Sequence, residues 1–291
     1  MVPEKIFILA NLQARTQNRA DLEQAVNEIN GKLPTEIVYT SSSDDAIEKA
    51  KQLSANPANI VAACGGDGTV NSVLQGISDQ GTLGIIPSGT ANVIARELGI
   101  PLNFRDACKN LLTGAVKKVD VGLCNGQRFL FVAGTGYDAQ VAGNVSPKLK
   151  QFLGKFAYHI ASVKELLTYK APELTFTFSD GQPSVTGEFA IIANMRRYGG
   201  DLFFAPQARY DDGILDLIVL KRFNPRTLLR LFNFARKVAP FPAQDAWQLR
   251  AESFSVSADS DCPYQLDGEA YSGIKTFYFS VKKQKINLLI P

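Results

Sequence analysis

The first part of the chain alternates short apolar runs with segments in which apolar residues recur every three or four positions. The runs have the length of buried strands, and the periodic segments have the spacing of helices that pack one face on a sheet. This alternation predicts a parallel sheet with helices on both faces. We expect strands at residues 5–11, 36–39, 59–64 and 83–86, and helices around residues 22–29, 43–53 (capped by Ser43), 70–77, 92–98 and 104–112.

From about residue 119 the pattern changes to short β-rich runs separated by turns. Asp-Gly pairs, which are strong turn signals, stand at residues 180–181, 212–213 and 267–268. The pattern predicts a second domain, an antiparallel β-sandwich or barrel. Its expected strands are residues 128–133, 173–179, 188–194, 214–220, 253–257 and 276–281, and its expected helices are residues 151–167 and 226–237. We place the boundary near residue 122, which gives domains 1–122 and 123–291, and the C-terminal tail can return to the first domain.

Composition narrows the class of protein. Net charge is only +3, so nothing indicates a nucleic-acid partner, and the apolar run at residues 6–10 is too short to span a membrane. The four cysteines contain no Cys-x-x-Cys pair, which argues against disulfides or a zinc site and favours a cytoplasmic location. The single histidine, His159, lies in a predicted helix and is expected to be structural; a site built from several histidines is excluded.

Two glycine-rich turns each join a predicted strand to a predicted helix. The first reads Gly-Gly-Asp-Gly-Thr at 65–69, and the second reads Pro-Ser-Gly-Thr-Ala-Asn at 87–92. Glycines allow backbone N–H groups to approach phosphate oxygens, and the helix that follows adds further N–H donors. Loops that follow neighbouring parallel strands meet at one crevice. The candidate phosphate-binding residues are Gly65, Gly66, Asp67, Gly68 and Thr69 in the first loop, and Ser88, Gly89, Thr90 and Asn92 in the second.

A single glycine turn could equally be a tight connection without a ligand. The carboxylate of Asp67 changes this balance, since a carboxylate beside phosphates is repulsive unless a metal ion bridges them. The first loop therefore suggests a nucleotide bound with Mg²⁺. Neither loop is a Walker A motif, because no Gly-Lys-Ser/Thr follows.

The two loops together resemble the catalytic domain shared by diacylglycerol, sphingosine and ceramide kinases and bacterial lipid kinases. The stretches that carry this resemblance are GGDGTVNSVLQGI, PSGTANVIARELGIP, the GTGYDA run at 134–139, the DDGILD run at 211–216 and the LDGE run at 266–269. The resemblance implies a Rossmann-like α/β nucleotide-binding domain followed by an antiparallel β-sandwich domain for the lipid substrate, with the active site in the cleft between them. It also implies transfer of the γ-phosphate of ATP to a lipid hydroxyl, with Mg²⁺ as the metal.

The resemblance assigns roles to further residues. Asp267 matches the family's catalytic acidic position as a general base, with Glu269 as the adjacent alternative; without the resemblance, both would be read as a hairpin turn. Asn11, Thr40 and Asn71 join the expected nucleotide contacts. The family's Asn-Pro-x-Ser-Gly stretch is reduced here to Asn11 alone, since residues 12–15 read Leu-Gln-Ala-Arg. In similar bacterial enzymes a structural Mg²⁺ lies at the turn that matches Asp212 and the carbonyls of Arg209 and Ile214.

Several alternatives remain open at this point. The acceptor could be soluble, as in NAD kinases, which share the Gly-Gly-Asp-Gly-Thr loop, or the protein could be a catalytically silent nucleotide- or lipid-binding homologue. A lipid kinase without a membrane span must reach its substrate as a peripheral protein. Residues 221–237 mix cations with bulky apolar residues, so this segment either docks on an anionic membrane or packs an apolar stripe of Leu228, Leu231, Phe232 and Ala235 on the β domain. A homodimer is also open.

Overall fold

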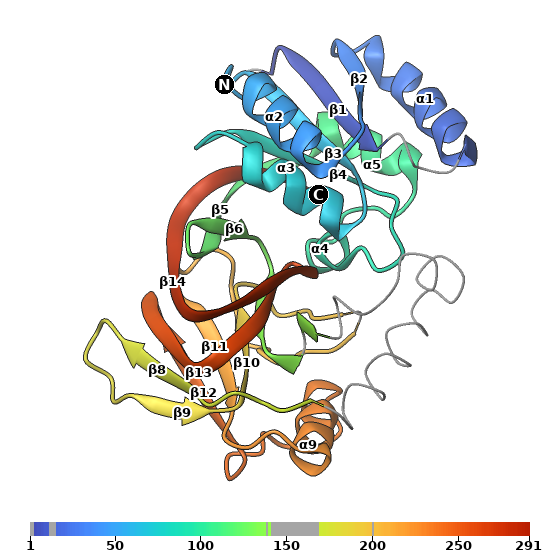
Figure 1. The fold of residues 1–291 in the computed structure, drawn as a ribbon. Helices are drawn as coiled ribbons and strands as arrows, with labels where there is room; N and C mark the ends of the chain where they lie inside the picture. The colour runs from blue at the N-terminus through green and yellow to red at the C-terminus, as the bar shows by residue number, and fades with distance from the viewer. Residues whose placement is uncertain (1–2, 12–15, 138, 141–168, 200) are drawn as a thin grey trace. The chain divides into compact units, whose positions relative to one another are not determined.

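The computed structural model describes residues 3–11, 16–137, 139–140, 169–199 and 201–291 (Figure 1). Its contacts divide the chain into two compact units. Unit 1 comprises Met1–Val121 and Lys283–Pro291, and unit 2 comprises Gly122–Lys282. The predicted helix at 151–167 and His159 lie outside the described residues.

Unit 1 is built on parallel strands. The strand order runs from the end of β14 through β4, β3 and β1 to β2, and each neighbouring pair is parallel. The apolar runs that predicted these strands are buried: Ile6, Ile8 and Val61 have no solvent exposure. The strands are β1 (Lys5–Asn11), β2 (Thr35–Thr40), β3 (Asn59–Gly65) and β4 (Thr82–Pro87), with β14 spanning Glu269–Ile290.

The helices of unit 1 connect these strands and begin where the sequence supplies caps. Ser42, rather than the predicted Ser43, caps α2, because its side chain accepts a hydrogen bond from the Asp45 N–H at 3.1 Å. Asn103 caps α5 through the N–H of Asp106. The helices are α1 (Thr16–Asn30), α2 (Ser43–Leu53), α3 (Asp67–Gly76), α4 (Val93–Glu97) and α5 (Phe104–Thr113).

Unit 2 is predominantly antiparallel, and its core is aromatic. Phe129, Phe176, Phe254, Phe277 and Phe279 form part of one buried cluster, and the rings of Phe254 and Phe279 stack at 5.1 Å. The strand order is β12-β11-β10-β7-β13-β14, and β8 also pairs with β13. The strands are β5 (Ala115–Cys124, which begins in unit 1), β6 (Gln127–Phe129), β7 (Val132–Thr135), β8 (Leu174–Phe178), β9 (Val185–Gly187), β10 (Phe189–Ala193), β11 (Leu215–Leu220), β12 (Ala246–Ala251) and β13 (Ser253–Leu266).

The structure corrects two predicted elements of unit 2. The expected strand at 128–133 is interrupted between β6 and β7, because the backbone N–H groups at 130–132 turn toward a carboxylate instead of a neighbouring strand. The predicted strands at 253–257 and 276–281 are parts of the longer strands β13 and β14. The amphipathic helix is α9 (Pro225–Ala235), with Pro225 in its first turn and Asn224 as its N-cap.

Candidate active site

The predicted phosphate loops lie at one edge of the parallel sheet of unit 1. The strands β1, β2, β3 and β4 all run in the same direction, so their carboxyl ends meet at that edge (Figure 1). Asn11 ends β1 beside Thr40 at the end of β2, and Gly65 ends β3 beside Pro87 at the end of β4. The topology therefore brings both loops to the side on which open α/β sheets bind ligands.

The first loop passes directly from β3 into α3. Gly66 is the N-cap residue of α3 and has extended backbone, and no side chain caps the helix. A Cβ at Gly65 would lie 2.2 Å from the Thr69 hydroxyl, so only glycine fits where strand and helix meet. The positive end of the helix dipole thus opens toward the carboxyl edge of the sheet, an arrangement that favours an anion.

The second loop packs against the first through glycine. A Cβ built on Gly89 would stand 2.4 Å from the Cα of Gly66, and the Ser88 N–H donates to the Gly65 carbonyl at 2.9 Å. Asn92, in the left-handed region at φ +47°, holds the turn by accepting from the Gly89 N–H and donating to the Gly89 carbonyl, both at 2.9 Å. Two backbones this close leave no room for side chains between them, and phosphate oxygens could approach both.

The remaining residues expected to contact the nucleotide are Asp67, Thr40, Asn71 and Asn11, and three of them form hydrogen bonds within unit 1. The Asp67 carboxylate, in the first turn of α3, accepts from the N–H of Ile94 at 3.2 Å and so ties the two loops together. The Thr40 hydroxyl is buried and donates to the Ala10 carbonyl at 3.4 Å. Asn71 is buried in α3, where its side chain accepts from Gln75 at 3.2 Å, whereas Asn11 is exposed. Their contacts with a nucleotide remain predictions.

The loops fit a phosphate-bearing nucleotide better than they define a metal site. The close Gly66–Gly89 approach forms a backbone cradle that a Cβ would fill, and Thr69, Ser88 and Thr90 supply hydroxyl side chains in the two loops. Within the part of the chain that the structure describes, no three His, Cys, Asp or Glu side chains form a metal-binding group. Asp67 would be the residue of the first loop to hold Mg²⁺ together with the phosphates.

Asp267 lies at the turn between β13 and β14 and is anchored by backbone. Its residue is only 1% exposed, and its backbone is left-handed at φ +52°. Its carboxylate accepts from three successive N–H groups: those of Leu130 at 2.7 Å, Phe131 at 2.9 Å and Val132 at 3.1 Å. We call these three N–H groups the amide nest. They satisfy both oxygens of the buried carboxylate and fix its orientation.

Glu269 has a different environment two residues later. It begins β14 and is exposed. The two predicted acidic positions are therefore one buried, immobilised carboxylate and one solvent-facing carboxylate. Within the nest, Phe131 and Val132 donate to Oδ1 of Asp267, and Leu130 donates to Oδ2.

At the turn expected to hold a structural Mg²⁺, the Asp212 carboxylate pairs with Arg250 of β12. The Asp212 carboxylate accepts from the Ile214 N–H at 3.1 Å and from Arg250 Nη2 at 2.5 Å. Arg250 also pairs with Asp216 at 3.2 Å. Since Arg250 already supplies the positive charge, Mg²⁺ at Asp212 and the carbonyls of Arg209 and Ile214 would have to displace it. That metal site remains a prediction.

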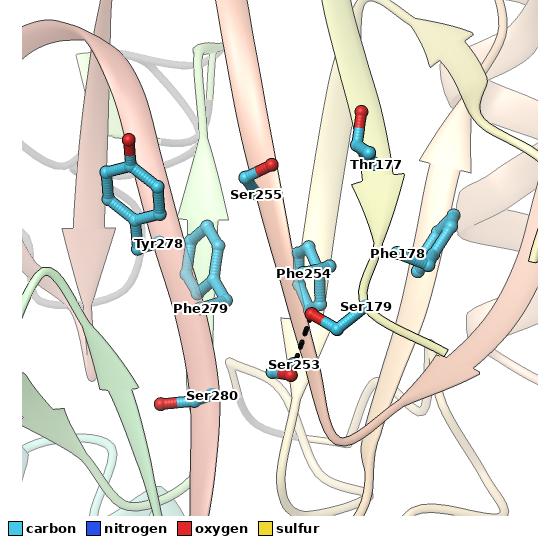
Figure 2. Close-up of a pocket in the computed structure, with 9 residues that line it drawn as sticks. All are labelled: Thr177, Phe178, Ser179, Ser253, Phe254, Ser255, Tyr278, Phe279 and Ser280. Carbon is cyan, nitrogen blue, oxygen red and sulfur yellow. Dashed lines mark hydrogen bonds between the residues drawn. The ribbon is translucent and has the colours of Figure 1, made fainter. Parts of the chain in front are cut away.

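A separate hollow of about 430 Å³ lies over β8, β13 and β14 in unit 2 (Figure 2). Phenylalanines and hydroxyl side chains line it, and the hydroxyls of Ser179 and Ser253 lie 3.0 Å apart. Tyr278, at 65% exposure, is its one ionisable lining residue. Neither Asp267 nor Glu269 lines this hollow, so it is distinct from the residues proposed for catalysis.

The elements around Asp267 include residues that the sequence did not single out. Asn194, which follows β10, is fully buried and donates from Nδ2 to the Leu130 carbonyl at 2.8 Å. Arg250, which pairs with Asp212 and Asp216 rather than with Asp267, is another residue that the sequence did not single out. No local motif marks either residue, because their partners lie 64 and 38 positions away in the chain.

A parallel α/β unit with two packed glycine loops, joined to a β-sandwich unit, defines the two-domain fold shared by lipid kinases and NAD kinases. A family model described as the diacylglycerol kinase catalytic domain matches residues 5–124. A second, described as the YegS C-terminal NAD kinase beta sandwich-like domain, matches residues 132–290.

Relatives agree over nearly the whole chain. A diacylglycerol kinase of Bacillus subtilis is 30% identical over 258 residues, which cover 87% of this chain and 84% of the relative. One from Staphylococcus saprophyticus is 30% identical over 251 residues, covering 85% and 82%. The chain therefore belongs to the diacylglycerol kinase family.

Solved structures agree on the fold. A diacylglycerol kinase structure from Bacillus anthracis superposes with a TM-score of 0.76 at 21% identity, covering 99% of this chain and 97% of that one. An Archaeoglobus fulgidus NAD kinase in complex with ATP gives a TM-score of 0.51 at 13% identity, covering 98% and 93%. The predicted fold class is confirmed: an α/β unit followed by a β-sandwich.

Proposed function

We propose that this protein transfers the γ-phosphate of ATP to the hydroxyl group of a lipid, with diacylglycerol as the first candidate acceptor. The observation that carries the proposal is the direct packing of Gly66 on Gly89, which places two glycine loops at the carboxyl edge of a parallel sheet. Membership of the diacylglycerol kinase family supports a lipid rather than a soluble acceptor. Bound Mg·ATP would supply the phosphoryl group, and the loop backbones and Asp67 would hold it.

For the acceptor, we assign Asp267 as the general base. The amide nest fixes the orientation of its carboxylate, which would accept the proton of the lipid hydroxyl group. Glu269 is the competing assignment, favoured by its exposure. Turnover separates the two: loss of kcat in Asp267→Asn with an active Glu269→Gln supports Asp267, and the opposite pattern assigns the base to Glu269.

The acceptor is tested by transfer of ³²P from ATP into a total lipid extract, resolved by chromatography, with purified diacylglycerol and NAD as defined acceptors. A labelled lipid that is absent with Gly66→Val is the expected result. Labelling of NAD alone would identify a soluble-acceptor kinase. ATP binding without any labelled product would indicate a silent binding protein.

We further propose that the outward face of α9 docks the protein on anionic membranes. None of the helices in the described part of the chain combines the length and hydrophobicity that a bilayer-spanning segment needs. The apolar stripe of α9 is packed in unit 2, which is one of the two alternatives left open for this segment: Leu228, Leu231 and Ala235 are buried, and the ring centroids of Phe232 and Phe204 lie 5.6 Å apart.

The opposite face of α9 is basic and partly apolar. Leu229 is 61% exposed, Val238 just after the helix is 71% exposed, and Arg226 and Arg236 are exposed as well. The helix contains no acidic residue. Arg230 pairs with Asp245 at 2.8 Å and so adds less to the positive charge of this face. Each exposed cation near an anionic leaflet contributes about 1 kcal/mol, and the attraction weakens with salt.

Co-sedimentation with vesicles tests this surface. Arg226→Glu/Arg236→Glu should reduce binding to phosphatidylserine-containing vesicles at low salt, while wild type should bind phosphatidylcholine vesicles weakly. Lys117→Glu/Lys118→Glu makes the same change in charge at exposed positions of β5 and is the matched control. Equal binding by the α9 variant and wild type would remove α9 from the docking surface.

A further inference from the structure

The segment that forms the amide nest is held from both sides of its peptide groups. On the N–H side, Leu130, Phe131 and Val132 all donate to the Asp267 carboxylate. On the carbonyl side, Leu130 accepts from Nδ2 of Asn194 at 2.8 Å, and Phe131 accepts from the Asn194 N–H at 2.9 Å. The carbonyl of Val132 accepts from the N–H of Asp267 at 2.8 Å. The Asp267 carboxylate therefore binds the N–H groups of this segment, and Asn194 binds the carbonyls of Leu130 and Phe131.

Burial makes this arrangement energetically demanding. Asn194 is 0% exposed and Leu130 is 0% exposed, so the Leu130 carbonyl has no water to replace a lost donor. A buried carbonyl without a donor is disfavoured, and the peptide relieves this by rotating. Rotation of that peptide would also move the Phe131 N–H, which shares the peptide plane with the Leu130 carbonyl and donates to Asp267 Oδ1 at 2.9 Å.

We infer that Asn194 is a positioning residue for Asp267. Its side-chain amide fixes the peptide group between Leu130 and Phe131, and the amide nest in turn fixes the orientation of the carboxylate. Asn194 acts through the backbone and does not touch the reacting atoms. The inference rests on the proposed lipid kinase function and on the assignment of Asp267 as base. It explains why an asparagine stands in a buried position just after the wholly apolar strand β10.

The test combines turnover with hydrogen–deuterium exchange of the full-length protein. Asn194→Leu keeps the branching at Cγ and the number of side-chain heavy atoms but removes the donor. We expect about 10-fold to 100-fold faster amide exchange in the peptide spanning residues 129–135, since one buried hydrogen bond is lost. We expect kcat to fall by about 10-fold to 100-fold with an unchanged KM for ATP, because only the orientation of the Asp267 carboxylate changes.

Val256→Ala is the matched control, because Val256 is a fully buried core residue of β13 whose truncation destabilises unit 2 without removing a donor from the nest. It should leave exchange at 129–135 and kcat near wild type at a temperature where both variants are folded. Unchanged exchange in Asn194→Leu, or faster exchange with unchanged kcat, would overturn the inference. The same effects in Val256→Ala would reduce Asn194 to a contributor to general stability.

The outcomes also separate this inference from the proposed function. A folded wild type that phosphorylates no lipid contradicts the kinase proposal, and the catalytic role of Asn194 falls with it. An active wild type whose nest exchanges equally in Asn194→Leu leaves the kinase proposal intact and refutes the inference alone.

Discussion

Replacing Asp267 with asparagine should destabilise unit 2 strongly, whatever its effect on catalysis. The carboxylate is buried and accepts three backbone hydrogen bonds. An asparagine side chain of the same shape keeps one oxygen, which can still accept from Phe131 and Val132. Its NH₂ group would face the Leu130 N–H, so two donors would oppose each other.

The size of the effect follows from these bonds. A buried donor left without an acceptor costs about 1–3 kcal/mol, and two charge-assisted bonds become neutral ones at roughly 0.5–1 kcal/mol each. The total is about 2–5 kcal/mol. Glu269→Gln, at an exposed position on the same turn, should stay within about 0.5 kcal/mol of wild type.

Urea unfolding followed by tryptophan fluorescence measures the loss of stability in unit 2. The chain has one tryptophan, Trp247, which lies in β12 of unit 2 under the ammonium group of Lys221 at 3.9 Å. With a denaturant slope of about 2–3 kcal/mol per molar urea, the midpoint of Asp267→Asn should fall by about 1–2 M. A midpoint shift no larger than that of Glu269→Gln would refute the anchored-carboxylate account, and the kinetic loss in Asp267→Asn could then be assigned to chemistry alone.

Three further predictions concern other parts of the molecule. Gly89→Ala should abolish ATP binding measured by calorimetry, because its Cβ would stand 2.4 Å from the Cα of Gly66; Gly99→Ala, strained but open, is the contrast. Burial raises the pKa of Asp216 from 3.8 to about 6, so the native state holds a proton that the unfolded chain releases, and stability falls as pH rises from about 4 to 6. Asp216→Asn should flatten this pH dependence, which amounts to at most about 3 kcal/mol. Unfolding curves at pH 4, 5, 6 and 7 give the free energy of unfolding, and the same pH dependence in wild type and variant would contradict the prediction. The four cysteines are buried and burial raises the pKa of each thiol to about 12, so a thiol reagent at pH 8 should label the protein only after unfolding; rapid labelling of the native protein would show that a thiol is accessible.

The fold was largely predictable because its signals are local. Apolar runs such as residues 59–64 become buried strands, and the glycines at 65–66 and 89 mark turns that only small residues allow. The tertiary use of Asp267 was not predictable. An Asp-Gly pair at 267–268 does form the turn that its local preference indicates, but its partners at 130–132 are more than 130 positions away.

The same limit explains the other differences between sequence and structure. The pattern at 128–133 is that of one strand, and only the distant carboxylate diverts its N–H groups. Residues 226–237 supported both a membrane-facing and a packed stripe, because amphipathicity does not state what covers the apolar side. The structure packs that stripe in unit 2.

The strand β14 makes unit 1 discontinuous in sequence. Asn287 and Leu288 pair with Thr82 and Leu83 in parallel, and Asn287 Nδ2 donates to the Gln80 carbonyl at 2.6 Å. During synthesis, the sheet beside β4 therefore stays open until residues 283–290 have left the ribosome, after all of unit 2. A fragment ending at residue 121 would expose the β4 edge to association with other chains, so unit 1 is better expressed with residues 283–291 fused to it than by truncation alone.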